Sequence, residues 1–227
     1  ARARARPAHR SRPGVAVVTR FGSVVLALLV ASGCGDAPPE AGPVGTSEVD
    51  FAAVERAYDA CLDGAVDEGV AALDSVLAQS PGAPDALVAR GLCRWARSED
   101  REALDDVQAA YDDLTSAIEA VEAGTPARGS ALDEIYSHRA FVAQTLDDGW
   151  VRTLEDLDQA VPLEPDEPRH ILDRGVVRSY LGDTLAARSD LEQYLVLADS
   201  FEVSDPARRA VVERLLEDLT PARTAAR

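Results

Sequence analysis

Histidines, cysteines, serines and paired acids are the residues of this sequence that could carry chemistry. The three histidines, His9, His138 and His170, have no HxxE, CxxC or other clustered ligand spacing around them. The serines lack a GxSxG elbow, and no Gly-rich phosphate loop follows a strand pattern. The sequence therefore predicts no catalytic residue, no metal site and no cofactor, and we expect a protein that is not an enzyme.

Adjacent acidic residues are the one pattern that could suggest hydrolytic chemistry, since glycosidases use a pair of carboxylates. Such pairs occur at Asp105–Asp106, Asp112–Asp113 and Asp147–Asp148. Neighbouring residues on a helix point in different directions, so they cannot flank one substrate bond. We interpret these acids as part of a solvated helical face.

Charge is unevenly distributed along the chain. Residues 1–33 contain six arginines and no acid, which leaves 40 acidic residues against 17 arginines in the remainder. This excess of negative charge argues against nucleic acid as a partner. It could attract a basic partner or cations, but acids spread along helices rather than massed in a tail favour a solvated surface that keeps an exported protein soluble.

The N-terminal region has the pattern of an export signal. A basic stretch ends at Arg20, and the apolar run Phe21–Val30 that follows is too short to span a bilayer. Next come Ala31-Ser32-Gly33-Cys34, which resemble the bacterial lipobox, although the usual Leu three residues before the cysteine is Ala31 here. The alternatives are a free cysteine after an ordinary signal peptide or after a short anchor helix.

The lipobox resemblance implies that Cys34 is lipidated and becomes the mature N-terminus. Residues 1–33 would then be a leader and signal peptide, and we expect residues 1–17 to be untranslated, with the start at Val18. The Pro- and Gly-rich stretch that follows predicts a disordered tether over residues 34–48. We expect the protein to be exported and lipid-anchored to the cell membrane or outer membrane, facing the periplasm or exterior.

The rest of the chain contains an internal repeat. Four segments place apolar or small residues on one helical face, each preceded by a second amphipathic stretch with a small residue at Ala57, Gly91, Ala140 or Gly175. Gly64 and Gly182 mark tight turns between the two stretches. The four segments are Gly69-x3-Leu73-x2-Val76-Leu77, Ala110-x3-Leu114-x2-Ala117-Ile118, Thr153-x3-Leu157-x2-Ala160-Val161 and Ala187-x3-Leu191-x2-Tyr194-Leu195.

These spacings resemble the tetratricopeptide repeat (TPR), a helix-turn-helix unit of about 34 residues. The best match is residues 174–195; the second unit departs by about seven extra residues around 98–103, and Arg94 and Arg178 stand where the family commonly has Tyr. The resemblance implies an all-α fold, an α-α superhelix in which a right-handed solenoid of about four repeats covers residues 49–201. Asp205-Pro206 predicts the start of a capping helix over 205–219, followed by a disordered tail over 220–227.

The resemblance also implies a concave partner-binding groove lined by the first helix of each repeat. By analogy with the family, the groove residues would be Tyr58, Trp95, Phe141, Gln144, Arg169 and Tyr180. The aromatic residues could instead serve only for packing. Cys61 and Cys93 lie about one repeat apart and would share an oxidising compartment, so a disulfide could join them. Repeat alignment places Cys61 toward the concave side and Cys93 toward the packing side, which leaves the pairing open.

These features predict a membrane-anchored, TPR-like lipoprotein that acts as a protein-protein interaction adaptor or assembly factor in the bacterial cell envelope. Its partners would be an envelope protein or peptide and, through the lipid, the membrane. Two alternatives remain. One is a regulatory TPR module of a transglutaminase-like or other envelope enzyme system; the other is a solute-binding lipoprotein, which would need a deep pocket.

Overall fold

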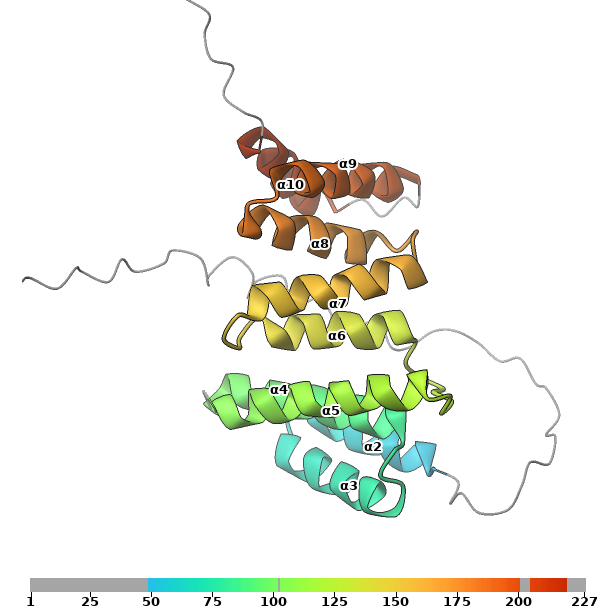
Figure 1. The fold of residues 1–227 in the computed structure, drawn as a ribbon. Helices are drawn as coiled ribbons and strands as arrows, with labels where there is room; N and C mark the ends of the chain where they lie inside the picture. Colours follow the sequence, from blue (N-terminus) through green and yellow to red (C-terminus); the bar gives the residue numbers. More distant parts are fainter. Residues whose placement is uncertain (1–48, 102, 201–204, 220–227) are drawn as a thin grey trace, which may run out of the picture. The chain divides into compact units, whose positions relative to one another are not determined.

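A computed structural model describes residues 49–101, 103–200 and 205–219, and the secondary structure within these ranges is helical, with no strand. These residues belong to the compact unit Thr46–Arg227. The helices form four consecutive pairs and one further helix (Figure 1). The pairs are α2 (Phe51–Leu62) with α3 (Val66–Gln79), α4 (Pro84–Arg101) with α5 (Leu104–Glu122), α6 (Leu132–Ala143) with α7 (Gly149–Leu163), and α8 (Pro168–Leu181) with α9 (Thr184–Ser200); α10 (Pro206–Asp218) follows.

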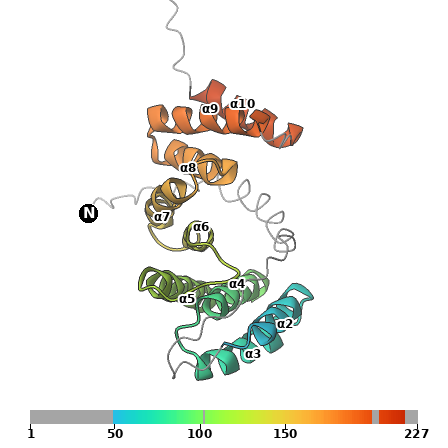
Figure 2. The ribbon, with the colours of Figure 1, turned by 90° about the vertical axis from the view of Figure 1, so that its right-hand side faces the viewer.

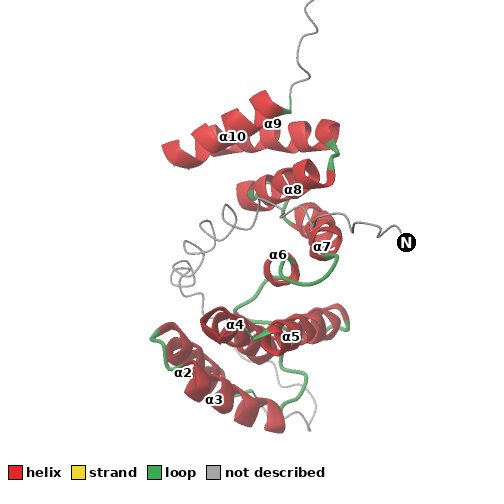
Figure 3. Cartoon of the chain, turned by 90° about the vertical axis from the view of Figure 1, so that its left-hand side faces the viewer, coloured by secondary structure: helices red, strands yellow, loops and turns green. Residues whose placement is uncertain are grey.

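The pairs stack in the order of the sequence. Each helix from α2 to α10 packs against the next one along the chain, and α4 also contacts both α2 and α6. Two views at right angles to the first show α5 and α7 on the same side of their partners α4 and α6, with α8 and α9 above them (Figures 2 and 3). The architecture is an all-α helical repeat superhelix, which confirms the fold class predicted from the sequence.

Small residues allow the two helices of a pair to approach closely, as the repeat pattern predicts. A Cβ on Gly175 of α8 would lie 3.0 Å from Asp190 Cβ and 3.1 Å from Leu191 Cγ of α9. Gly91 of α4 faces Leu114 of α5 in the same way, with 3.2 Å to its Cγ. The repeated leucines of the second helices are almost completely buried at these crossings: Leu73, Leu114, Leu157 and Leu191.

Glycine also forms the tight turns inside two of the pairs. Gly64 has φ 91° between α2 and α3, and Gly182 has φ 85° between α8 and α9. This left-handed conformation ends a helix at little cost only when no Cβ is present. Both turns lie where the sequence predicts them.

The extra residues of the second repeat lengthen its first helix. α4 continues to Arg101, and the added part carries Arg97 and Arg101. Arg97 binds Asp106 of α5 at 2.5 Å, and Arg101 binds Asp67 of α3 at 2.5 Å. The insertion therefore adds ionic contacts to both neighbouring second helices.

α10 closes the described stack. Asp205 is its N-cap, accepting from the N–H groups of Ala207 and Arg208, and Val212 is buried against α9. Val211, which the sequence also places on the apolar stripe, is 40% exposed. In the described ranges no helix has the length and apolar character needed to cross a membrane. Cys34, the predicted leader and tether, and residues 220–227 lie outside the described residues.

Candidate functional site

An aromatic pair lies on the first-helix face where the second and third repeats meet. The rings of Trp95 on α4 and Phe141 on α6 are 4.7 Å apart between centroids and inclined by 60°, an edge-to-face contact. Both side chains are only partly buried. Tyr58 on α2 packs against the same N-terminal core, and burial raises the pKa of its hydroxyl. Three of the predicted groove residues thus lie on three successive first helices.

The other three predicted groove residues have different surroundings. Tyr180, 48% exposed, stacks on Trp150 of α7 at 4.7 Å, so it contacts a second helix and not the Trp95–Phe141 pair. The sequence analysis did not single out Trp150. Gln144 is the C-cap of α6, and Arg169 lies in the first turn of α8, where its backbone N–H donates to Glu167.

A cluster of arginines and aspartates connects the helices of the fourth repeat. Arg174 and Arg178 of α8 both bind Asp190 of α9, each with a contact of 2.8 Å. They also reach Asp158 of the preceding helix α7, at 3.4 Å and 2.9 Å. The Asp190 side chain is 4% exposed, so its charge is almost fully removed from water and is compensated by the two guanidinium groups.

The same arrangement recurs in the two preceding repeats. In the second repeat Arg90 and Arg94 bind Asp113 of α5 at 2.6 Å and 2.8 Å, and Arg90 binds Asp74 of α3 at 2.7 Å. In the third repeat a single arginine takes this role. Arg139 binds Asp156 of α7 at 2.6 Å and donates to Thr115 of α5 at 3.2 Å. We call these three sets the Arg–Asp clusters.

Two arginines of the clusters stand where the tetratricopeptide-repeat resemblance led us to expect Tyr. These are Arg94 and Arg178, and each binds an aspartate on the second helix of its own repeat. The sequence contains a pattern that could have indicated the clusters. An Asp directly precedes the repeated Leu at positions 113, 156 and 190, and an Arg directly precedes the small residue of the first helix in the same repeats.

The paired acids contribute to structure and do not converge on a substrate. Asp113 is buried and bound by arginines, whereas its neighbour Asp112 is exposed and accepts from Gln108 at 2.8 Å. Asp106 binds Arg97, while Asp105 is exposed. The members of these two pairs have different surroundings, as expected for adjacent helical residues. Asp147 and Asp148 do not lie within a helix as expected, but in the turn between α6 and α7, where Asp148 has φ 56°.

The connection between α5 and α6 lies against the beginnings of α2 and α4. The carboxylate of Asp85 on α4, which is 8% exposed, accepts from the backbone N–H of Arg128 at 3.0 Å and of Gly129 at 2.9 Å. The guanidinium of Arg128 lies over the ring of Phe51 on α2, 4.3 Å from its centroid. We call Phe51 and Asp85 the loop seat. No pattern in the sequence analysis pointed to it.

A disulfide joins Cys61 on α2 to Cys93 on α4, with 5.8 Å between their Cα atoms. Both cysteines are buried, Cys61 to 7% exposure and Cys93 to 1%. The pairing that the repeat alignment left open is therefore formed. Gly69 of α3 has no side chain at this point, and that leaves room for the sulfur of Cys61 between the helices.

The two histidines of the described region lie between α6 and α8. His170, 2% exposed, is within 2.9 Å of Asp133 Oδ2 through Nε2 and so connects α8 to α6. Burial, with the positive charges of Arg169 and His170, lowers the pKa of His138 to about 4. Across the described ranges, no group of three or more His, Cys, Asp or Glu side chains is arranged to hold a metal ion.

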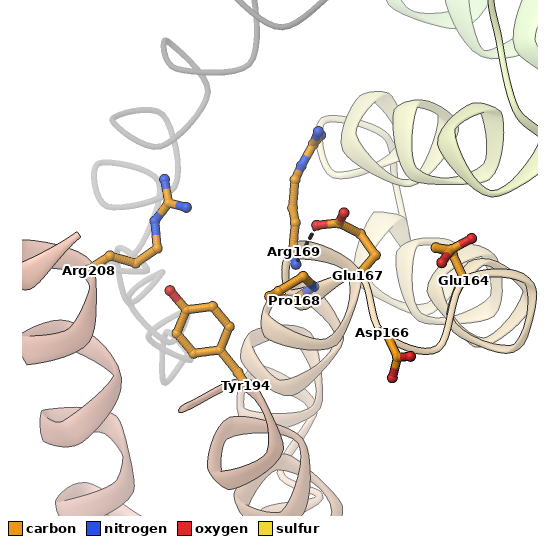
Figure 4. Close-up of a pocket in the computed structure, with 7 residues that line it drawn as sticks. All are labelled: Glu164, Asp166, Glu167, Pro168, Arg169, Tyr194 and Arg208. Atoms are coloured by element: carbon orange, nitrogen blue, oxygen red, sulfur yellow. Dashed lines mark hydrogen bonds between the residues drawn. The ribbon is translucent and has the colours of Figure 1, made fainter. Parts of the chain in front are cut away.

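A cavity of about 510 Å³ opens beside the start of α8 (Figure 4). Arg169 and Arg208 stand in its wall, each 3.8 Å from its nearest acid, Asp173 and Asp205 respectively. Arginines of the Arg–Asp clusters make much closer contacts with acids, and Arg208 also forms a hydrogen bond with Tyr194. The lining residues are Glu164, Asp166, Glu167, Pro168, Arg169, Tyr194 and Arg208.

Comparison with known proteins agrees with this architecture. Residues 143–217 match the family model described as tetratricopeptide repeat. No curated protein sequence matches the chain. Among solved structures, a chain of the APC/C hetero-tetramer Cut9–Hcn1 superposes with a TM-score of 0.58 at 14% identity, covering 75% of this chain and 30% of that one. YrrB, a TPR protein with an unusual peptide-binding site, superposes with 0.52 at 14% identity, covering 75% of this chain and 86% of its own.

At 14% sequence identity, these two superpositions show a shared fold and nothing about function. This chain also spans only 30% of the length of the Cut9–Hcn1 chain. What they share with it is the stacked helix pair. The family match begins at the last residue of α6 and covers α7, α8, α9 and nearly all of α10. The described domain therefore has the fold of a tetratricopeptide-repeat protein, and residues 143–217 carry the sequence signature of that repeat.

Proposed function

We propose that this protein is a lipid-anchored adaptor of the bacterial cell envelope, which binds an envelope protein or peptide on its first-helix face and catalyses no reaction. The single observation that carries the binding role is the Trp95–Phe141 pair, where two partly exposed rings from neighbouring repeats meet at 4.7 Å. Aromatic side chains bury much area at small entropic cost, so they are frequent anchors of protein interfaces.

The fold supports the same proposal. A stack of helix pairs presents a long surface that a partner segment can follow across several repeats. The structurally similar YrrB is described as having a peptide-binding site, which adds a fold-level analogy. The anchor rests on the lipobox resemblance at Cys34, and the 14 residues between Cys34 and Val49 would hold the domain close to the membrane.

The proposal is tested by crosslinking and pull-down from native membranes. Wild type is compared with Trp95→Ala/Phe141→Ala and with Trp150→Ala/Tyr180→Ala, a second aromatic pair with the same 4.7 Å spacing that joins α7 to α8. We expect an envelope protein to be recovered with wild type and with the second variant, and to be lost with the first. Equal recovery with both double variants would refute binding at the Trp95–Phe141 pair.

The anchor is tested separately with Cys34→Ala. We expect this variant to leave the membrane fraction, because the acyl chains on the cysteine supply the hydrophobic attachment. Labelling cells with a radioactive or alkyne-bearing fatty acid should mark wild type and not the variant. If the variant stays in the membrane fraction and wild type takes no label, the lipoprotein proposal is wrong.

The cavity beside α8 supports a second candidate, solute binding by the same lipoprotein. Its volume of about 510 Å³ lies within the range of small-molecule sites. Two arginines and three acids line it, so a zwitterionic solute such as an amino acid would match this mixed charge better than a carboxylate alone. Calorimetric titration with small dicarboxylates and amino acids decides this point. Binding that is lost in Arg169→Ala/Arg208→Ala supports it, and no heat with any ligand refutes it.

A further inference from the structure

We propose that the loop seat on Phe51 and Asp85 is a self-association site, which receives residues 220–224 of a second copy of this chain. In the monomer the α5–α6 connection occupies the seat and competes with that segment. The inference goes beyond the proposed function and does not depend on it.

The occupant of the seat shows which chemistry it accepts. Asp85 receives two consecutive backbone N–H groups, from Arg128 and Gly129, so it binds a bent main chain whose neighbouring N–H groups point the same way. Phe51 receives the guanidinium of Arg128 on its face. The carboxylate accepts two backbone N–H groups, and the ring accepts a cation on its face. Together they select a segment with Arg at one defined position.

The sequence carries this segment twice. The occupant is Thr125-Pro126-Ala127-Arg128, and the same four residues recur as Thr220-Pro221-Ala222-Arg223 directly after α10 and Leu219. In the second occurrence Arg223 and Thr224 would supply the two N–H groups, and Arg223 the guanidinium. A third Pro-Ala-Arg, at 206–208, forms the first turn of α10 and is therefore part of a helix.

Thr224 replaces Gly129 in this comparison, and the seat has room for it. A Cβ on Gly129 would be 3.5 Å from Asp85 Oδ1, an ordinary van der Waals distance. No other heavy atom outside its immediate neighbours lies within 4 Å of that Cβ. The space around this position therefore also admits a residue with a side chain.

Few contacts attach the present occupant to its seat. The α5–α6 connection covers residues 123–131, whereas the equivalent connections cover only 80–83 and 164–167. Gly124, Thr125, Pro126, Arg128 and Gly129 are exposed. Two hydrogen bonds to Asp85 and one ring contact attach the loop to α2 and α4, and these are the same contacts that a replacing segment would form. Exchange therefore replaces each contact by one of the same kind, and the tethering of the loop to its own chain is what favours the monomer.

The geometry favours a second copy over the same one. α2 and α10 lie at opposite ends of the stack (Figure 1). Arg223 follows Asp218 by five residues, which can span about 17 Å when fully extended. From α4 the first-helix side continues through α6 and α8 to α10, and each step between packed helices adds about 8–10 Å. A contact of one end with the other end of a neighbour is heterologous, so it can join two or more copies.

The test measures molar mass by light scattering during size exclusion, over a range of concentrations. Arg128→Ala removes the competing guanidinium, and we expect it to shift the protein from monomer toward dimer and larger species. Arg128→Ala/Arg223→Ala should return it to monomer. Arg128→Ala/Arg227→Ala is the matched control, because it removes a tail arginine outside the repeated segment, and it should behave like Arg128→Ala.

A labelled peptide of residues 219–224 with blocked ends gives an independent measurement. We expect it to bind Arg128→Ala at least about tenfold more tightly than wild type, and we expect its Arg223→Ala form not to bind. Phe51→Ala in the Arg128→Ala background should abolish binding while the melting curve stays cooperative. The proposal is overturned if Arg128→Ala remains monomeric at all concentrations, or if the two peptides bind equally. Neither result would affect capture of an envelope protein at Trp95–Phe141.

Discussion

Arg174 of α8 and Asp190 of α9 form a two-point contact, with Nε 3.0 Å from Oδ2 and Nη2 2.8 Å from Oδ1. The planar guanidinium matches the carboxylate, so this pair fixes the angle between the two helices as well as their distance. Equivalent pairs recur in the second and third repeats. Charge pairs thus join the two helices in three of the four repeats.

Asp190→Ala should destabilise the protein by about 3 kcal/mol. The substitution leaves Arg174 and Arg178, which are 15% and 19% exposed, without their main partner, and breaking one side of a buried ion pair costs more than the pair contributes. Urea unfolding measures this loss. Asp158→Ala is the control; Asp158 touches the same arginines but is 42% exposed, so we expect a loss of about 1 kcal/mol or less. Equal losses in both variants would contradict the role given to burial.

The fold could be predicted from the sequence because it depends on residues whose spacing is local. Leu191 follows Ala187 by one helical turn, and Gly175 precedes Ala187 by the same interval as Ala57 precedes Gly69, so periodicity locates both helices of the fourth repeat and their crossing. Gly182 similarly indicates the turn between α8 and α9, because its φ of 85° is a conformation that few residues other than glycine adopt.

The site was harder to predict because it depends on pairs that are distant in sequence. Phe51, Asp85 and Arg128 share no motif, and only the folded stack brings them together. Tyr180 was assigned to the groove from its helical position, but its ring turns toward Trp150 of another helix. The sulfur of Cys61 fits beside Cys93 because Gly69 has no side chain. The helical pattern predicts only a small residue at position 69, so it could not predict the pairing.

Removal of the disulfide by Cys61→Ser/Cys93→Ser should lower the free energy of unfolding by about 3 to 4 kcal/mol, from the closure of a 32-residue segment. The first repeat has no Arg–Asp cluster, because Ala72 occupies the place of the aspartate and Arg56 is exposed. We therefore expect the loss of the disulfide to affect this repeat most. Hydrogen exchange should show lost protection mainly in α2 and α3. Loss spread evenly over α2 to α9 would show that the bond does not act locally.

Stability should fall as the pH decreases from about 6.5 to 4 because of His138. Its pKa is about 4 in the folded protein and 6.5 in the unfolded chain, so in this window the unfolded state binds more protons. The contribution is fully present above pH 6.5 and is lost toward pH 4, with at most about 3 kcal/mol involved. Urea unfolding at pH 7, 5.5 and 4.5 measures it. His138→Gln should flatten this part of the profile, and an unchanged profile would assign the dependence to other groups.

Gly69→Ala should destabilise the first repeat by about 2 kcal/mol or more, while Gly82→Ala should not. A Cβ on Gly69 would lie 2.6 Å from the backbone oxygen of Ala57 and would collide with Cys61 Sγ, whereas a Cβ on Gly82 meets no atom within 4 Å. The sulfur cannot move aside, because it is bonded to Cys93. Thermal unfolding of both variants measures the difference. In a Cys61→Ala/Cys93→Ala background the cost of Gly69→Ala should decrease but not vanish, since the carbonyl of Ala57 remains. An unchanged cost would show that the helix backbone alone limits the approach of α2 to α3, and that the sulfur has no part in it.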